Sequence, residues 1–211
     1  VKVIKKRNRL GLAKLSDISG IKSSPASNNL GFTIAPRINA CGRISHAHLA
    51  VDLLLCKDIS DATDLVHKVE NCNIMRQNIE KKTLEKVYQY AERKKENSRF
   101  IWVADEGWHQ GIIGIVAGRL KERYNRPAIV ISKNNKGIGV ASGRSIKAVD
   151  LGEKIQTLLQ EDLLITGGGH KMAVGFTLEE KKIEQAMYRL NELIEADSIS
   201  SQKQVEIEVD G

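Results

Sequence analysis

The sequence stretches Ala141-Ser142-Gly143-Arg144-Ser145 and Thr166-Gly167-Gly168-Gly169-His170 decide the expected fold. Each follows a short run that is typical of a strand, so we expect a strand to end in a tight turn at both places. Successive backbone N–H groups in such turns can bind an anion. Arginine, histidine and serine side chains bind phosphate oxygens as well. Both stretches therefore predict phosphate-binding turns, and the alternative is that they are ordinary tight turns.

Strands and helices alternate on both sides of these stretches. We expect strands over residues 100–104, 127–132, 137–141, 163–166 and 172–177, and helices over residues 111–124, 149–159 and 179–196. Within the first of these helices, Gly111, Gly114 and Gly118 indicate a close approach of its backbone to the sheet. The alternation predicts an α/β domain with a small sheet of about five strands flanked by helices.

A long helix is expected before this domain. No glycine or proline occurs from Ser60 to Glu96, and apolar residues at helical spacing occupy both ends of this segment. Residues 71–82 are much more polar. We therefore expect a connector helix with packed ends and a solvated middle. Residues 1–22 indicate one short helix, and residues 23–29 have the composition of a loop.

Composition narrows the class of protein. The chain has 211 residues and a net charge of +7, which favours a polyanionic partner. Aromatic residues make up 4%, too few for extensive base-stacking platforms. Cys41, Cys56 and Cys72 are scattered, as in a reduced cytoplasmic protein rather than a disulfide framework or zinc site. No apolar run is long enough to span a membrane, so we expect no membrane partner.

A further polar cluster occupies the segment Pro36-Arg37-Ile38-Asn39-Ala40-Cys41-Gly42-Arg43. Proline disfavours helix at the residue before it, and Gly42 interrupts the other end. Two arginines and an asparagine in an otherwise apolar or small stretch indicate a cluster directed at a ligand. A surface turn with solvated arginines explains the same residues. Ser45 is expected to cap the following helix.

Together these motifs resemble the RecJ family within the DHH phosphoesterase superfamily. The segment from Pro36 to Arg43, the motif Trp108-His109-Gln110-Gly111-Ile112-Ile113-Gly114 and the two glycine-rich stretches occur in the family's order and spacing, over residues 30–195. The resemblance implies two α/β domains joined by a long helix, with the active site between them. On this basis residues 1–58 end the DHH catalytic domain, and residues 59–96 form the connector. Residues 97–197 form the DHH-associated substrate-binding domain, and residues 198–211 begin a following segment such as an oligonucleotide-binding barrel.

The resemblance also assigns the site. It places phosphate contacts on seven residues, namely Arg43, Ser142, Arg144, His170, Gly167, Gly168 and Gly169. It gives supporting roles to Arg37, Asn39, His109 and Ser145. No Asp-His-His triplet and no Asp-x-Asp pair occurs in the chain, so no catalytic or metal-binding residue is expected here. The ligands of Mn²⁺ or Mg²⁺ in the complete enzyme are expected upstream of Val1.

The function implied is that of a cytoplasmic, metal-dependent exonuclease. It would degrade single-stranded DNA from the 5′ end in DNA repair and recombination, with a single-stranded-DNA-binding protein or helicase as a partner of the complete protein. This part alone is expected to bind nucleic-acid phosphates and to be inactive. One alternative is another DHH-family phosphoesterase, such as an oligoribonuclease or a cyclic-dinucleotide phosphodiesterase. The other is a nucleic-acid-binding module without chemistry.

Overall fold

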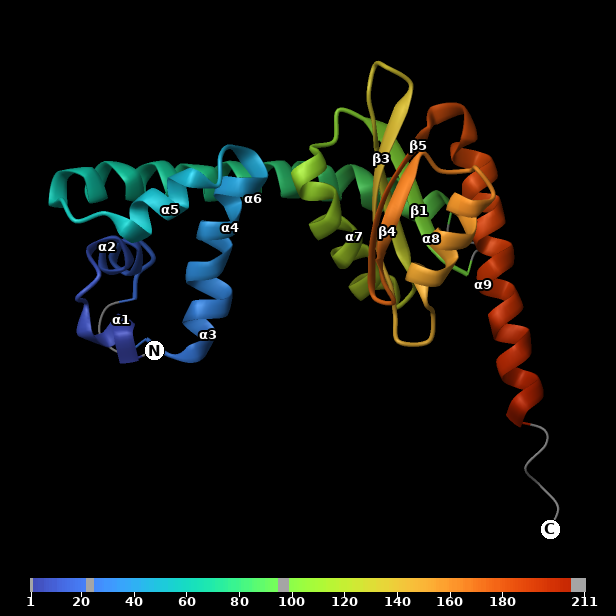
Figure 1. Cartoon of the computed structure of the whole chain (residues 1–211), viewed down its shortest axis with the longest axis horizontal. Helices are drawn as coiled ribbons and strands as arrows, with labels where there is room; N and C mark the ends of the chain where they lie inside the picture. The colour runs from blue at the N-terminus through green and yellow to red at the C-terminus, as the bar shows by residue number, and fades with distance from the viewer. Residues whose placement is uncertain (1, 22–24, 95–98, 206–211) are drawn as a thin grey trace, which may run out of the picture. The chain divides into compact units, whose positions relative to one another are not determined.

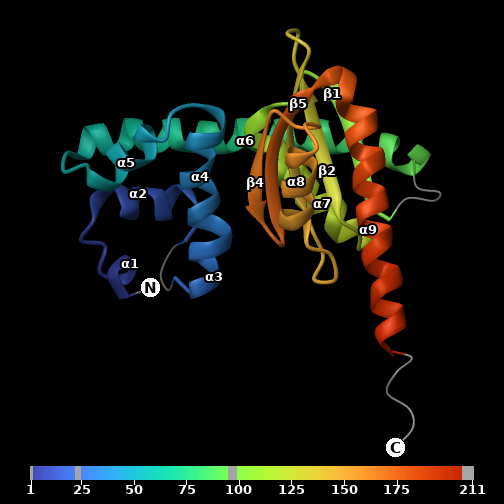
Figure 2. The same cartoon turned by 45° about the vertical axis from the view of Figure 1, so that its right-hand side comes forward.

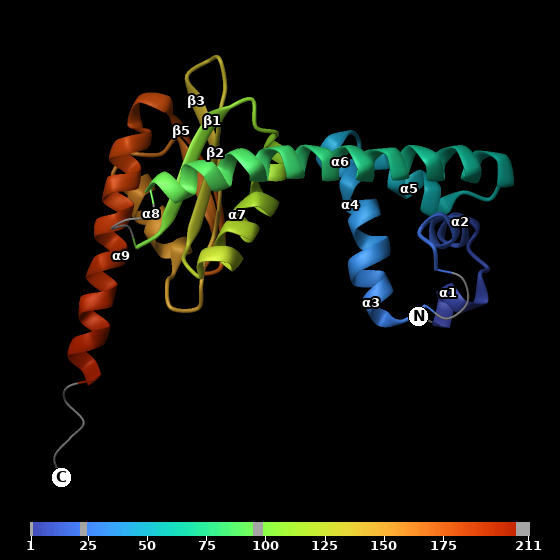
Figure 3. The same ribbon diagram turned by 180° about the vertical axis from the view of Figure 1, so that it is seen from behind.

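The computed structural model describes residues 2–21, 25–94 and 99–205, which form parts of two compact units (Figure 1). The first unit is Val1–Lys81 and the second is Lys82–Gly211. The boundary lies within α6 (Ile59–Lys94), a single unbroken helix (Figure 3), so each unit contains a part of it. The domain boundaries expected after residues 58, 96 and 197 stay predictions.

The first unit is helical. Its elements before α6 are α1 (Lys2–Lys6), α2 (Leu10–Ile18), α3 (Ser27–Asn29), the π-helical turn η1 (Leu30–Ile34), α4 (Ala35–Ile44) and α5 (His48–Leu55). Its core joins α2, α4 and α5 to the first part of α6 through Leu15, Ala40, Cys41, Leu53 and Val69. Residues 1–22 therefore contain two helices in the described part rather than the one that we expected.

The segment around Pro36 is a helix, which corrects the expected irregular segment. Pro36 lies in the first turn of α4, where proline is tolerated, and the π-helical turn η1 leads directly into this turn. Gly42 lies in the last turn and is exposed. Ser45 follows α4, and α5 begins at His48 after Ala47, so Ser45 does not cap it.

The second unit is built on a five-stranded mixed sheet, which confirms the predicted α/β class. The strands are β1 (Ile101–Glu106), β2 (Ala128–Lys133), β3 (Ile138–Arg144), β4 (Thr166–His170) and β5 (Ala173–Glu179). Their order in the sheet is β1-β2-β3-β5-β4. The pair β1 and β2 is parallel, and the other pairs are antiparallel. This order leaves β1 and β4 at the two edges (Figure 2).

Helices lie on both faces of this sheet (Figures 1 and 2). On one face, α8 (Leu151–Gln160) and α9 (Ile183–Val205) cover the main core, with the turn η2 (Glu180–Lys182) leading into α9. That core includes Ile131, Phe176, Ile155, Leu158 and Met187. On the other face, α7 (Gln110–Tyr124) packs on β2 and β3. The residues expected after 197 begin inside α9, and residues 206–211 lie outside the described part.

The two glycine-rich stretches are strands, which corrects the predicted tight turns. Ser142 and Gly143 pair with β2 on one side and with β5 on the other. Residues 166–170 form β4 and pair with β5 along their whole length. The chain reverses after His170, at Lys171 and Met172. Backbone groups that we assigned to anion-binding turns are therefore partly used in the sheet.

The middle of α6 is more buried than we expected. Asn73, Glu80 and Thr83 are buried and continue the buried stripe of the helix. Arg76 joins two of these side chains, since it donates to Asn73 Oδ1 over 2.7 Å and to Glu80 Oε2 over 2.6 Å. Polar side chains can line this stripe because they satisfy one another within the helix.

Candidate phosphate-binding site

Strand register brings the two predicted stretches together across β5. Arg144 is opposite Ala173, which is opposite His170 on β4. Ser142 and Gly168 lie in the neighbouring row, on either side of β5. Residues directly opposite one another on adjacent strands project to the same face. The side chains of Ser142, Arg144 and His170 therefore project from the face that α7 partly covers.

The surface between these side chains is formed by glycine residues. Gly175 on β5 is opposite both Ser142 and Gly168. A methyl group added to Gly168 would meet nothing within 4 Å. Gly175 and His170 are exposed, whereas Ser142 and Arg144 are half-buried. We call the surface of Ser142, Arg144, Gly168, His170 and Gly175 the polar strip.

The Arg144 side chain is held against its own strand. Its Nη1 donates to the carbonyl of Gly143 over 2.8 Å and to Ser142 Oγ over 3.2 Å. A Cβ atom on Gly114 of α7 would lie 3.0 Å from Arg144 Nη2 and 3.0 Å from Ser142 Oγ. The missing side chain of Gly114 therefore lets α7 lie close to this pair. A planar guanidinium with five N–H donors can bind two phosphate oxygens at once.

His170 is oriented by its own turn. Its Nδ1 accepts a hydrogen bond from the Met172 amide over 3.3 Å, so the neutral ring carries its proton on Nε2. The first turn of α8 lies behind its backbone, because a Cβ atom on Gly152 would be 2.9 Å from the His170 carbonyl carbon. The Leu151 amide donates to the next carbonyl, that of Lys171, over 3.2 Å. His170 thus presents an exposed N–H donor from a supported backbone.

Gly167 and Gly169 have different surroundings from Gly168. A Cβ atom on Gly167 would lie 2.9 Å from Ile155 Cγ2, on the side of the core under α8. Gly169 has a φ of +143°, and a Cβ atom there would lie 2.3 Å from the Ala173 carbonyl oxygen. Substitution of either glycine would meet neighbouring atoms, whereas a Cβ atom on the half-buried Gly168 would meet nothing within 4 Å. Because β4 is an edge strand, alternate backbone N–H groups along it point away from β5.

Ser145 and His109 have structural contacts. Ser145 is buried, and its hydroxyl donates to the Val149 carbonyl over 2.7 Å, so it holds the connection from β3 to α8. His109 caps α7, since its Nδ1 accepts from the Gly111 amide over 3.1 Å. Neither contact involves the polar strip, and a supporting role for either residue in phosphate binding stays a prediction.

Arg37, Asn39 and Arg43 all lie on α4, in the helical unit. Arg37 forms a two-point ion pair with Glu70 of α6, with N–O distances of 2.6 and 3.3 Å, so it ties the two helices together. Asn39 and Arg43 are exposed and four residues apart, which places them on one face of the helix. Their participation in one site with the polar strip stays a prediction.

The described residues contain no group of three or more histidine, cysteine, aspartate or glutamate side chains that could bind a metal ion. The donor set of a Mn²⁺ or Mg²⁺ site is therefore not found in this part of the chain, and no chemical step is assigned to a metal here. Among the same residues, no helix is both long and apolar enough to cross a lipid bilayer.

Sequence reasoning missed Gly175 of the polar strip and Ala173, which lies between Arg144 and His170 in the register. Gly175 and Ala173 alternate with the large apolar residues Val174 and Phe176 along β5, and this alternation is the signal that could have identified a strand with one bare face. The close approach expected for the glycines of α7 is confirmed at Gly114. At Gly118 an added methyl group would meet nothing within 4 Å, so the expectation is wrong there.

Comparison with known proteins places this arrangement in a family. The model of the DHHA1 domain matches residues 76–196. Single-stranded-DNA-specific exonuclease RecJ of Bacillus subtilis is 38% identical over 192 residues, which cover 90% of this chain and 24% of that protein. RecJ of Salmonella typhimurium is 35% identical over 88% of this chain and 33% of that protein. The chain thus spans about a quarter to a third of the length of these relatives.

Comparison with solved structures gives the same family as the sequence comparison. The crystal structure of RecJ from Thermus thermophilus in complex with Mn²⁺ superposes with a TM-score of 0.80 at 30% identity, over 92% of this chain and 28% of that one. The same protein is also known in complex with Mg²⁺. Since the family match covers more than half of the chain and the named relatives cover most of it, the chain belongs to the DHHA1 domain family and contains the RecJ-like form of that domain.

Proposed function

We propose that this chain is the substrate-binding part of a RecJ-like exonuclease and that its polar strip binds the backbone phosphates of single-stranded DNA. The complete protein would hydrolyse phosphodiester bonds from the 5′ end in DNA repair and recombination. Its metal site would be supplied by residues outside this chain. The relatives named RecJ support the substrate class, and the composition of the strip supports the contact to phosphate.

The observation that carries the proposal is the register across β3, β5 and β4. It places a guanidinium, a hydroxyl and an imidazole on one face around two glycines, Gly168 and Gly175. All three side chains are good donors to phosphate oxygens. The glycines allow a sugar-phosphate backbone to approach the sheet without a steric barrier. The net charge of +7 adds a general attraction for nucleic acid.

These residues suggest how the chain contributes to hydrolysis. Arg144 and His170 would grip the oxygens of one phosphate and fix its orientation, while Ser142 would hold the guanidinium in place. Such positioning lowers the entropy cost of reaching the transition state. The metal ions that would activate the attacking water would be held by residues outside this chain, so the 211-residue chain should bind DNA but not cleave it.

The test uses Arg144→Lys in the 211-residue chain, with Arg189→Lys as the matched control. Arg189 lies on α9, on the opposite face of the sheet, and pairs with Glu161. Affinity for fluorescein-labelled single-stranded DNA is measured by anisotropy over a salt series. A charge-assisted hydrogen bond contributes on the order of 1.5–3 kcal/mol, so Arg144→Lys should weaken binding by roughly 10- to 150-fold. Arg189→Lys should leave it unchanged.

The salt series and added Mn²⁺ extend this test. If about three phosphates are contacted, log K should fall with log salt at a slope of about −2. Arg144→Lys keeps the positive charge, so its slope should stay close to that of the parent chain even though its affinity is lower. With Mn²⁺ present, the chain should release no mononucleotides. Equal affinity of Arg144→Lys and the parent chain would refute the proposed site, and preferential binding of a cyclic dinucleotide would favour the other phosphoesterase class.

A further inference from the structure

The outer edge of β1 is a second surface of the sheet, separate from the polar strip. The Ile101 amide donates to the Pro127 carbonyl over 2.8 Å, which fixes the phase of the parallel ladder with β2. In that ladder, the backbone groups of Ile101 and Val103 face β2, and those of Ala104 face away from it. Among the described residues, no strand pairs with this edge. An edge of this kind is a template for another extended chain.

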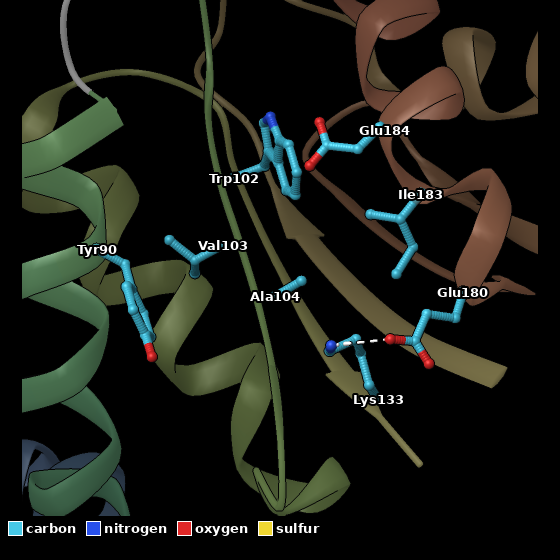
Figure 4. Close-up of a pocket in the computed structure, with 8 residues that line it drawn as sticks. All are labelled: Tyr90, Trp102, Val103, Ala104, Lys133, Glu180, Ile183 and Glu184. Atoms are coloured by element: carbon cyan, nitrogen blue, oxygen red, sulfur yellow. Dashed lines mark hydrogen bonds and ion pairs between the residues drawn. The ribbon is translucent and has the colours of Figure 1, made fainter. Parts of the chain in front are cut away.

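A cavity of about 350 Å³ runs along this edge (Figure 4). Tyr90 from α6 lines one side, and Ile183 and Glu184 from α9 line the other, with Ala104 and Trp102 between them. All of these residues belong to the second unit. The volume is at the lower end of the range for ligand pockets, which is enough for one or two side chains but not for a folded domain.

The charge around the cavity is negative. Lys133 and Glu180 close one end with an ion pair of 2.9 Å, so this lysine is neutralised. Glu184 and Glu106 are exposed carboxylates nearby on α9 and β1. The hydrogen bond with Glu180 raises the pKa of Lys133 against the opposing effect of burial, and the charges of Glu180, Glu106 and Asp105 act in the same direction as the hydrogen bond. The local charge is thus opposite to the net charge of the chain.

We infer that the β1 edge and its cavity bind an extended protein segment that alternates apolar and basic residues and joins the sheet as a further strand. The backbone of such a segment would pair with Ala104, its apolar side chains would enter the cavity beside Ile183, and its basic side chains would face Glu184 and Glu106. Nucleic acid does not suit this surface, because its phosphates would meet carboxylates. A second copy of the chain suits it less well, since two β1 strands would bring Asp105 and Glu106 of both copies together.

The probe for this inference is a fluorescein-labelled peptide of alternating valine and lysine, titrated against the 211-residue chain. The peptide and the chain are both positively charged, so their net charges repel each other and cannot cause nonspecific binding. We expect saturable binding with a dissociation constant of about 10 μM. The same peptide with every second amide N-methylated should bind with an affinity at least about tenfold lower. The methylated peptide tests strand pairing without any change in the protein.

Two variants locate the site. Ala104→Pro removes an outward N–H without removing a bond to β2, and it should weaken peptide binding at least about tenfold. Glu184→Lys should weaken it several-fold, whereas Glu195→Lys, about three turns further along α9, should not. Sedimentation of the free chain accompanies these titrations. The inference would be overturned if the peptide did not bind, or if its binding were unchanged by N-methylation and by both variants. It would also be overturned if the free chain formed a dimer that Ala104→Pro dissociates.

Discussion

On the face covered by α8 and α9, the sheet presents Ile131, Phe176 and other apolar side chains to a closed core. On the face under α7, β3 presents Ser142 and Arg144, and β5 presents Gly175. The strands β3 and β5 contribute to both faces, because neighbouring residues alternate between them. Apolar burial under α8 and α9, and also under α7, contributes to the folding free energy, whereas the polar strip beside α7 can be bare and polar at little cost. Substitutions on the two faces should separate stability from DNA affinity.

The largest contrast is expected between adjacent glycines of β4. Gly169→Ala forces a methyl group to within 2.3 Å of the Ala173 carbonyl oxygen at a φ of +143°, so it should lower the free energy of unfolding by about 3 kcal/mol. Gly168→Ala has open space and should stay within about 0.5 kcal/mol of the parent. It should instead weaken DNA binding roughly tenfold, because its methyl group enters the polar strip. Urea unfolding and anisotropy measure the two effects, and equal loss of stability in both variants would break the contrast.

The next contrast is between two glycines of α7. Gly114→Ala places a methyl group 3.0 Å from Arg144 Nη2, so the guanidinium must move and DNA affinity should fall roughly tenfold. Gly118→Ala meets nothing within 4 Å and should only stabilise the helix, by about 0.5–1 kcal/mol. Thermal unfolding and DNA titration of both variants provide the measurements. Unchanged affinity of Gly114→Ala would show that the position of Arg144 is unimportant for binding.

A smaller contrast separates two serines of the same segment. Ser142→Ala removes a hydrogen-bond partner of Arg144 and should weaken DNA binding by about 0.5–1.5 kcal/mol with little change in stability. Ser145→Ala leaves the Val149 carbonyl without its buried donor and should cost about 1 kcal/mol of stability with unchanged DNA binding. The thermal midpoint of Ser145→Ala should fall by roughly 2–4 °C. Weaker DNA binding by Ser145→Ala together with lower stability of Ser142→Ala would contradict the assignment of the binding surface to the polar strip.

The smallest effect concerns the attachment of α7. Burial, and then the hydrogen bond to Glu92, raise the pKa of Tyr124 to about 12, from about 10 in an unfolded chain. A raised pKa favours the protonated folded form, so this contribution to stability is complete below pH 10 and is lost as the pH rises towards 12. Between pH 10 and 11, the thermal midpoint of Tyr124→Phe should therefore fall by less than that of the parent. A parallel decline in both proteins would contradict the assignment.

Local patterns predicted the elements better than they predicted their ends. Helical spacing and the absence of glycine and proline predicted the long helix to within a few residues of α6. The same local rules failed at residues 166–170, because glycine is typical of turns in isolation. Pairing with β5 extends these residues into a strand, and this pairing depends on a part of the chain that follows them. The helix at Pro36 was missed because proline is tolerated in the first turn.

The candidate site shows the same limit. The resemblance to the RecJ family identified Ser142, Arg144 and His170 as a group, and register explains how they share a face. No local pattern indicates that Gly114 lies against Arg144, because the two residues belong to different elements. The buried polar side chains Asn73 and Glu80 were also unpredictable, since Arg76 satisfies them and polarity alone indicates exposure.

The register across β3, β5 and β4 has a consequence for how such chains can lengthen during evolution. One residue inserted into β5 would turn Val174 and Phe176 outward and Gly175 into the core, because each residue beyond the insertion changes face. A single insertion would thus damage folding and the polar strip together. The hairpin loop between β2 and β3, from Asn134 to Gly137, tolerates extra residues, since it contributes no side chain to either face of the sheet. Length variation among related chains should therefore be found in that loop and be absent from β5.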